Sequence, residues 1–167
     1  MWVVDVDGGN VRHLRPHTHP DAHSAVVNHQ VVTAAGIAYE AVDYHDDGTR
    51  TNYLGRYHPA DDTFTEGRLP VPGYVHVGFD PAGELDIIEH ASRDGHELLR
   101  VLPSETPGGD LRVERIRRLA SPYREEQRSH AHPFLSPDRR WLFWTDWSSD
   151  GFSQVFRMST DSLDVRA

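Results

Sequence analysis

Short apolar runs separated by turn residues recur along the whole chain. Residues 29–44 contain two such runs around a glycine, and further runs follow in residues 45–58, 62–79 and 80–103. The last runs, in residues 132–160, are joined by Ser-Ser-Asp-Gly. No long segment has convincing helical periodicity, and closely spaced runs with Asp-Gly and Pro-x-Gly turns are typical of antiparallel strands. The pattern predicts an all-β protein.

Two segments depart from this pattern. Residues 111–121, LRVERIRRLAS, are the best candidate for a helix, but Val113, Ile116 and the interleaved arginines fit a strand equally well. Residues 11–23, VRHLRPHTHPDAH, contain four histidines and two prolines and read as a polar connection. The HTHPDAH part looks like the metal motif of metallo-β-lactamase-like hydrolases, although its spacing is one residue too long.

Three segments of the chain align with one another. Each begins with histidine, passes through a short apolar run and a turn, and enters a second apolar run: residues 29–41, 76–90 and 132–146. A third run follows each of them, as NYLGRYH, HELLRVL and SQVFRMS. The repeat length of about 50 residues is that of one four-stranded propeller blade. We therefore expect residues 1–167 to form one domain of about three β-propeller blades.

Radial blades bring equivalent positions on their innermost strands together near a central channel. The histidine that begins each repeat would start such a strand. His29, His76 and the pair His130 and His132 would then line one mouth of the channel. The alternative is that these histidines are ordinary strand-start residues that recur because the blades recur.

The stretch QRSHAHP places Gln127, His130 and His132 within six residues. Side chains alternate in an extended chain, so the two histidines would point the same way. Two neutral imidazoles with an amide oxygen nearby would supply three ligands for a metal ion of borderline softness. A solvated histidine pair at the start of a strand is the competing interpretation.

Composition narrows the functional classes. The formal net charge of −9 argues against nucleic acid or an anionic membrane as the main partner, and an anionic substrate would need a local positive centre. The chain has no cysteine, which excludes disulfides and thiolate catalysis. No run approaches the ~20 apolar residues of a membrane span, and the start lacks the pattern of a signal peptide. A cytoplasmic location is the default expectation.

Four motifs resemble one known family, the oligogalacturonate lyases, which degrade pectin fragments. They are VNHQVVTAAGIAYEA, GYVHVGFDPAGELDIIEHAS, QRSHAHPFLSPDRRWLFWTDW and DGFSQVFRMS, of which the third is the most specific. The match covers most of this chain but less than half of a family member, at its C-terminal part. The resemblance implies a fragment of a seven-bladed β-propeller that cleaves oligogalacturonides.

The resemblance also implies roles for individual residues. The family binds a divalent metal, typically Mn²⁺, through three histidines and a glutamine, which fall here on His76, Gln127, His130 and His132. Its Brønsted base falls on His29. The neighbour of this base is Gln30, where the family usually has glutamate. With neutral ligands the cation would keep its full charge for an anionic sugar.

The family's active-site arginine has no counterpart in this sequence. In the family it stands just before a Met-Trp pair that starts a blade strand, and this chain begins at that pair, Met1-Trp2. Arg12 and Arg15 lie nearby, but neither matches the motif. On this basis we expect a truncated reading frame or a C-terminal fragment.

The resemblance implies β-elimination at a uronate. His29 would remove the proton α to the carboxylate while the metal accepts the developing negative charge, and the C4–O bond would then break. A second reading is a non-catalytic propeller fragment, a binding module that self-associates through open blade edges. A third is a small metal-dependent barrel of the cupin type, which the blade-like repeat and the missing cupin glutamate argue against.

Overall fold

We describe the fold from a computed structural model of the chain. The structure describes residues 1–14, 22–72, 74–92, 95–106, 109–120, 130–148 and 150–163. These residues form an all-β protein, as the sequence predicts, and none of them is in an α-helix. The only helical turn described is a short 3-10 helix, η2 (Thr160–Leu163).

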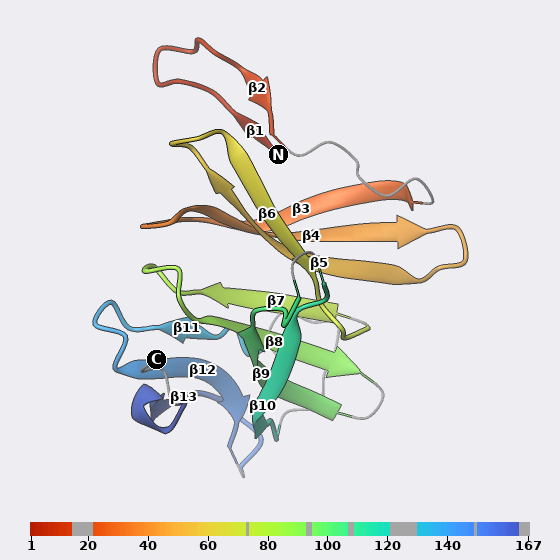
Figure 1. Cartoon of the computed structure of the whole chain (residues 1–167). Helices are drawn as coiled ribbons and strands as arrows, with labels where there is room; N and C mark the ends of the chain where they lie inside the picture. The colour runs from red at the N-terminus through yellow and green to blue at the C-terminus, as the bar shows by residue number, and fades with distance from the viewer. Residues whose placement is uncertain are drawn as a thin grey trace.

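Two four-stranded antiparallel sheets form the centre of the molecule (Figure 1). The first contains β3 (Ala22–Thr33), β4 (Gly36–His45), β5 (Arg50–His58) and β6 (Thr63–Arg68). The second contains β7 (Tyr74–Phe79), β8 (Asp86–Ser92), β9 (Gly95–Leu102) and β10 (Arg112–Arg118). In both sheets consecutive strands pair in chain order, so each sheet is a meander.

Two smaller sheets flank this pair, one at each end of the chain. The C-terminal sheet has three strands, β11 (Phe134–Leu135), β12 (Trp141–Trp147) and β13 (Ser153–Ser159). The N-terminal hairpin pairs β1 (Trp2–Val3) with β2 (Arg12–His13). Of the four sheets in the described part of the chain, none closes on itself.

The first strands of the three larger sheets lie next to one another. β7 contacts β3 on one side and β11 on the other, although these strands are far apart in sequence. Figure 1 shows the three sheets following one another from top to bottom in chain order. Side chains that point out from β3, β7 and the start of β11 can therefore meet at one place.

The core lies between successive sheets. Between the second and third sheets, Ile87, Leu98, Leu142 and Trp144 are buried in one cluster. A second cluster joins the first and second sheets. Burial alternates along β12, where every second residue is buried, whereas six consecutive residues of β4 are buried. Packing of one meander on the next thus fixes the relative positions of their first strands.

The structure decides several of the predictions made from sequence. The ambiguous segment of arginines is strand β10, which pairs with β9 along its length. The third run of the last repeat coincides with β13. The polar connection between residues 11 and 23 is a loop only in part, because it includes β2 and the start of β3, and residues 15–21 lie outside the described part. No described helix is long and apolar enough to cross a membrane.

The expected strand-start position of the histidines is wrong in detail. His29 lies well inside β3, at a bulge where pairing with β4 shifts between Asn28 and Val31. His76 is the third residue of β7, and His132 precedes β11 by two residues. The three repeats therefore begin within or just before the first strand of a sheet, at a different place in each case.

Candidate metal centre

Three histidines, one from β7 of the second sheet and two from the segment that leads into the third sheet, converge in the structure. One ring nitrogen each of His76, His130 and His132 lies within 4.8 Å of the others. The ring centroid of His76 is 4.7 Å from that of His130 and 4.5 Å from that of His132, and the last two are 5.7 Å apart. This is the spacing from which three imidazole nitrogens can turn toward one cation.

The segment that carries His130 and His132 is fixed by its neighbours on both sides. Ala131, between the two histidines, is fully buried in the core, and its carbonyl accepts a hydrogen bond from the Thr145 N–H at 2.8 Å. On the other side, a Cβ at Gly78 of β7 would lie 2.1 Å from the Pro133 carbonyl oxygen. Only glycine permits β7 to approach so closely, and this contact brings His76 beside the pair.

The backbone at His132 is not extended. Its φ is 43°, in the left-handed region that a non-glycine residue adopts at a cost of about 1–3 kcal/mol. We expected His130 and His132 to point the same way because side chains alternate in a strand. That reason is wrong, since the two residues are not in a strand. The two rings meet His76 because the chain turns at His132, before β11 begins.

A buried glutamate is hydrogen-bonded to two of the three histidines. Glu89 of β8 has no exposed surface, and its Oε2 accepts hydrogen bonds from His76 Nδ1 and from the His132 main-chain N–H, both at 3.1 Å. Its Oε1 accepts a hydrogen bond from His96 Nε2 at 2.7 Å. Burial alone would raise the pKa of Glu89, but the hydrogen bonds from His76 and His96 hold this pKa well below its usual value.

A fourth histidine lies beside the cluster without joining it. The ring of His29 is 4.9 Å from that of His76, edge to face, and its side chain is 33% exposed. Its Nδ1 donates a hydrogen bond of 2.7 Å to Oε2 of the buried Glu40. A carboxylate accepts only, so the proton of a neutral His29 lies on Nδ1 and Nε2 carries the lone pair. This is the arrangement of an oriented general base.

The backbone at His29 is left-handed too, with a φ of 50°. It lies at the β3 bulge, where His29 and Gln30 have no partner in the register of β4. A bulge turns one side chain out of the regular alternation of a strand. Two of the four site histidines thus sit in unfavourable backbone conformations, a feature common at functional sites.

Electrostatics within the cluster favour the neutral form of His132. The pKa of His132 lies below its ordinary value, first because of burial and then because of its neighbour His76. Two buried carboxylates, Glu40 and Glu89, each lie one hydrogen bond away from a site histidine. We expected a bound cation to keep its full charge because its ligands are neutral. The two carboxylates next to the histidines would offset much of that charge.

The residues expected from sequence fall into three groups. His76, His130 and His132 come together, with His29 next to them. Gln127 lies outside the described residues. The side chains of His17, His19 and His23 also lie outside the described set. The structure therefore does not test the prediction made for the HTHPDAH motif.

Sequence reasoning missed Glu40, Glu89 and His96. The two glutamates stand near the end of the first two repeats, as His29…Glu40 and His76…Glu89, so the alignment of the repeats contained them. Because each second strand folds back on the first, Glu89 faces His76 in the register, and Glu40 faces Asn28. Gln30 does not take the orienting role, since its amide donates to the Val27 carbonyl; Glu40 does.

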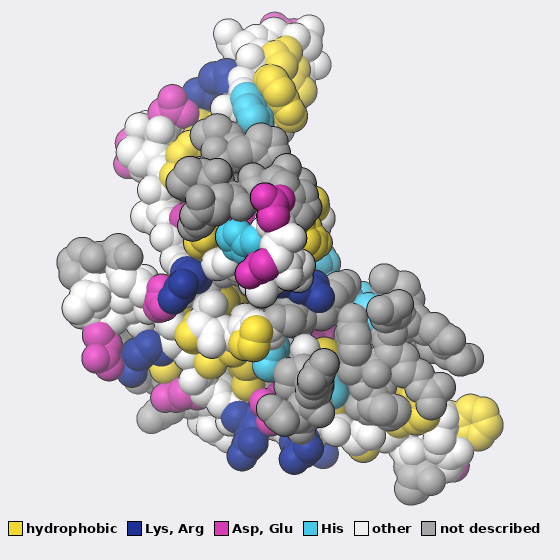
Figure 2. All heavy atoms as spheres, turned by 90° about the vertical axis from the view of Figure 1, so that its right-hand side faces the viewer, with side chains coloured by type: hydrophobic (Ala, Val, Ile, Leu, Met, Phe, Trp, Pro, Cys, Tyr) yellow, Lys and Arg dark blue, Asp and Glu magenta, His cyan; other side chains and the backbone are white. Residues whose placement is uncertain are grey.

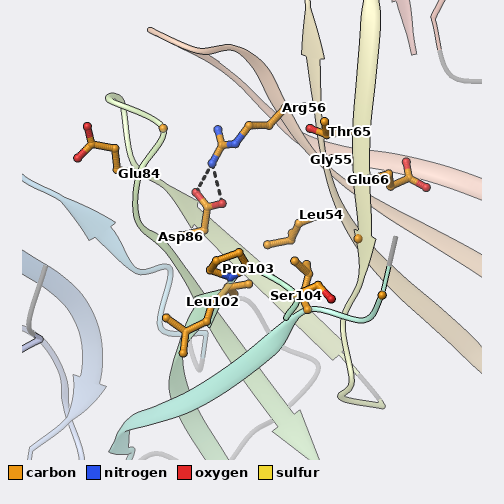
Figure 3. Close-up of a pocket in the computed structure, with 15 residues that line it drawn as sticks. Leu54, Gly55, Arg56, Thr65, Glu66, Glu84, Asp86, Leu102, Pro103 and Ser104 are labelled. Carbon is orange, nitrogen blue, oxygen red and sulfur yellow. Dashed lines mark hydrogen bonds and ion pairs between the residues drawn. The ribbon is translucent and has the colours of Figure 1, made fainter. Parts of the chain in front are cut away.

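A separate pocket of about 430 Å³ lies between the first and second sheets. Figure 3 shows the Arg56 side chain reaching from β5 toward Asp86 of β8, which it binds with Nη2 at 2.7 and 2.8 Å. Burial raises the pKa of Asp86, and Arg56 opposes that rise. The described lining has no histidine, and we assign this ion pair to the joining of the two sheets.

Comparison of the chain with protein-family models, with curated proteins and with solved structures found no match. The resemblance to oligogalacturonate lyases stays a prediction from the sequence motifs.

Proposed function

We propose that this chain is a metal-dependent lyase that cleaves oligogalacturonides by β-elimination, with His29 as the base. The observation that carries the proposal is the His29–Glu40 pair placed 4.9 Å, ring to ring, from His76 of the three-histidine cluster. An oriented base beside a cation site is what proton removal next to a carboxylate requires. The sequence motifs supply the substrate class.

On this proposal the three larger sheets are blades of a β-propeller. Each is a meander, and their first strands lie side by side, as the innermost strands of neighbouring blades would. About three blades form part of a seven-bladed ring. The site histidines come from these first strands or their approach, which fits a site at the mouth of a central channel.

The residues fit a divalent transition-metal ion. Glu89 accepts a hydrogen bond from the Nδ1–H of His76. The lone pair of this ring then lies on Nε2, where it can bind a cation. His130 and His132 supply two more imidazoles, and Gln127 is the proposed fourth ligand. Imidazole suits Zn²⁺ and Fe²⁺ as well as Mn²⁺, so the donor set defines the class of ion, and the sequence motifs favour Mn²⁺ within it.

The chemistry divides between the cation and the protein side chains. When bound, the cation supplies Lewis-acid stabilisation of negative charge on the uronate carboxylate. Nε2 of His29 takes the proton from the carbon next to that carboxylate. Glu40 stabilises the imidazolium that forms, through its hydrogen bond to Nδ1. The electron pair of the broken C–H bond forms the new C4–C5 double bond. The C4–O bond breaks with its electron pair on the departing oxygen, which takes a proton from water, and a 4,5-unsaturated sugar remains.

The second candidate is a non-catalytic binding module that associates with itself or with a missing half. Apolar side chains favour it, because Trp2, Val4 and Val11 of the N-terminal hairpin and Val32 of β3 are exposed. Figure 2 shows exposed hydrophobic side chains at the upper end of the molecule, where the hairpin lies. Light scattering distinguishes the two, since a stable monomer with native β structure would contradict association as its role.

The experiment that tests the lyase is turnover of digalacturonate with added Mn²⁺, followed by ultraviolet absorbance of the unsaturated product. We expect His29→Ala to lower the rate by about 10²–10⁴-fold, the usual contribution of a general base, and to leave Mn²⁺ affinity within about twofold. Unchanged turnover in this variant would refute the role of His29. Bound metal without any product from the wild type would favour the binding module.

A further inference from the structure

Glu89 bonds to both of the elements that carry the three candidate ligands. It lies on β8, the neighbour of β7, and directly faces His76 in the register. Its Oε2 accepts from the His76 ring in the second sheet and from the His132 main chain, which leads into the third sheet. A carboxylate with two acceptor oxygens thus spans the seam across which the cluster is built.

The hydrogen bond to His76 selects one form of its ring. The peptide N–H of His132 donates to Glu89 Oε2 in any protonation state, so this oxygen acts as an acceptor. The same oxygen therefore accepts a hydrogen bond from His76 Nδ1, and the proton lies on that nitrogen. With that nitrogen occupied, Nε2 of His76 is the atom that remains for a cation.

The hydrogen bond to His132 acts on the backbone. The peptide N–H that donates to Glu89 belongs to the residue with the left-handed φ of 43°. Holding that N–H turns the ring of His132 toward His76, at 4.5 Å between centroids. Without Glu89 as acceptor, the backbone at His132 would lose this hydrogen bond and would be free to become extended.

The second oxygen of Glu89 is held independently. His96 at the start of β9 is 3% exposed and donates from Nε2 to Oε1 at 2.7 Å. The carboxylate therefore has donors on both oxygens and cannot rotate freely. Through this bond to Glu89, His96 acts on the site.

We propose that Glu89 is the positioning residue of the metal centre, which fixes the ring form of His76 and the backbone turn at His132, with His96 holding its other oxygen. This role rests on the proposed metal centre. Glu89 need not touch substrate or cation to carry it out. The first sheet offers a natural comparison, because Glu40 is a buried carboxylate with a similar bond to His29, which is outside the three-ligand group.

The comparison gives a matched pair of variants, Glu89→Gln and Glu40→Gln. Both replace a buried carboxylate by an isosteric amide bonded to histidine. We expect Glu89→Gln to weaken Mn²⁺ binding, measured by titration calorimetry, about 10–100-fold, the usual loss for a residue behind a metal ligand. We expect Glu40→Gln, which removes the same charge but bonds none of the three candidate ligands, to weaken Mn²⁺ binding by a smaller factor than Glu89→Gln does. Equal affinities of the wild type and a folded Glu89→Gln would overturn the proposal.

A measurement on the unaltered protein keeps the test independent of variant folding. Long-range ¹⁵N–¹H spectra of the metal-free protein report which ring nitrogen of each histidine carries the proton, with His76 assigned by comparison with His76→Gln. We expect the Nδ1-protonated form for His76. Protonation on Nε2 alone would overturn the proposal, whatever the affinities are. If the wild type binds no Mn²⁺, the metal centre itself is refuted, whereas normal wild-type binding with unaffected Glu89→Gln refutes only the role of Glu89.

Discussion

Replacement of Gly78 by alanine is a sharp test of how the cluster is assembled. The added Cβ would lie 2.1 Å from the Pro133 carbonyl oxygen and 2.8 Å from its carbonyl carbon, both of them backbone atoms. Ordinary van der Waals contact begins at 3.4 Å. The two backbones must therefore separate by about 1.3 Å, the difference between 3.4 and 2.1 Å, because neither neighbour can rotate away.

That separation moves His132, adjacent to Pro133, away from His76, two residues before Gly78. Metal–ligand distances tolerate changes of only about 0.2 Å. A displacement of about 1 Å at a site can lower its function about 10²-fold. Overpacking of this kind also destabilises a fold by about 1–3 kcal/mol. We expect Gly78→Ala to lose Mn²⁺ affinity at least about 10²-fold, while its melting temperature falls by about 2–12 °C and the protein stays folded at 25 °C.

Titration calorimetry with Mn²⁺ and differential scanning calorimetry on the metal-free protein measure the two effects separately. Gly67→Ala is the matched control, since its Cβ would meet only the side chain of Leu111, outside the histidine cluster. We expect the control to bind Mn²⁺ as the wild type does. Wild-type affinity in Gly78→Ala would show that the β7–Pro133 contact does not set the ligand spacing.

Two further predictions concern stability. Leu142→Ala should lower the free energy of unfolding by about 2–5 kcal/mol, measured by urea denaturation, because Leu142 is fully buried between the second and third sheets; a loss below about 1 kcal/mol would contradict that packing. Glu89, whose pKa is lowered on folding, stabilises the metal-free protein fully above its unfolded pKa near 4.5 and less as the pH falls. The stability difference between wild type and Glu89→Gln should therefore shrink by about 1 kcal/mol from pH 5 to pH 3.5, and a difference that grows would reverse the assigned sign.

The strand pattern was within reach of the sequence because it depends on local regularities. Turn residues and short apolar runs located the meanders, and the third run of the last repeat coincides with β13. Residues 112–118 could not be assigned, since arginines alternating with Val113 and Ile116 satisfy both a strand and a helix face. Pairing with β9, the preceding strand, decides for the strand, and this pairing is not visible in the pattern of the segment itself.

The candidate site was found only in part, for a similar reason. Aligned repeats brought His29, His76 and His132 to one place, but the conformation of a single residue is not visible in a repeat. At the left-handed turn, the His132 N–H donates to Glu89, which is 43 residues away. Such a partner can be recognised only when the strand register is known, and for that reason the carboxylates behind the histidines were missed.

The seam between the second and third sheets has a consequence for how this protein could change over evolutionary time. His76 belongs to one meander, and His130 and His132 belong to the approach to the next. Duplication, loss or exchange of a whole meander, the usual route by which repeat folds diverge, would split the ligand set in one event. Such a protein could keep its fold and lose the proposed metal centre at once, because the three candidate ligands stay together only when the two adjacent meanders are inherited as a pair.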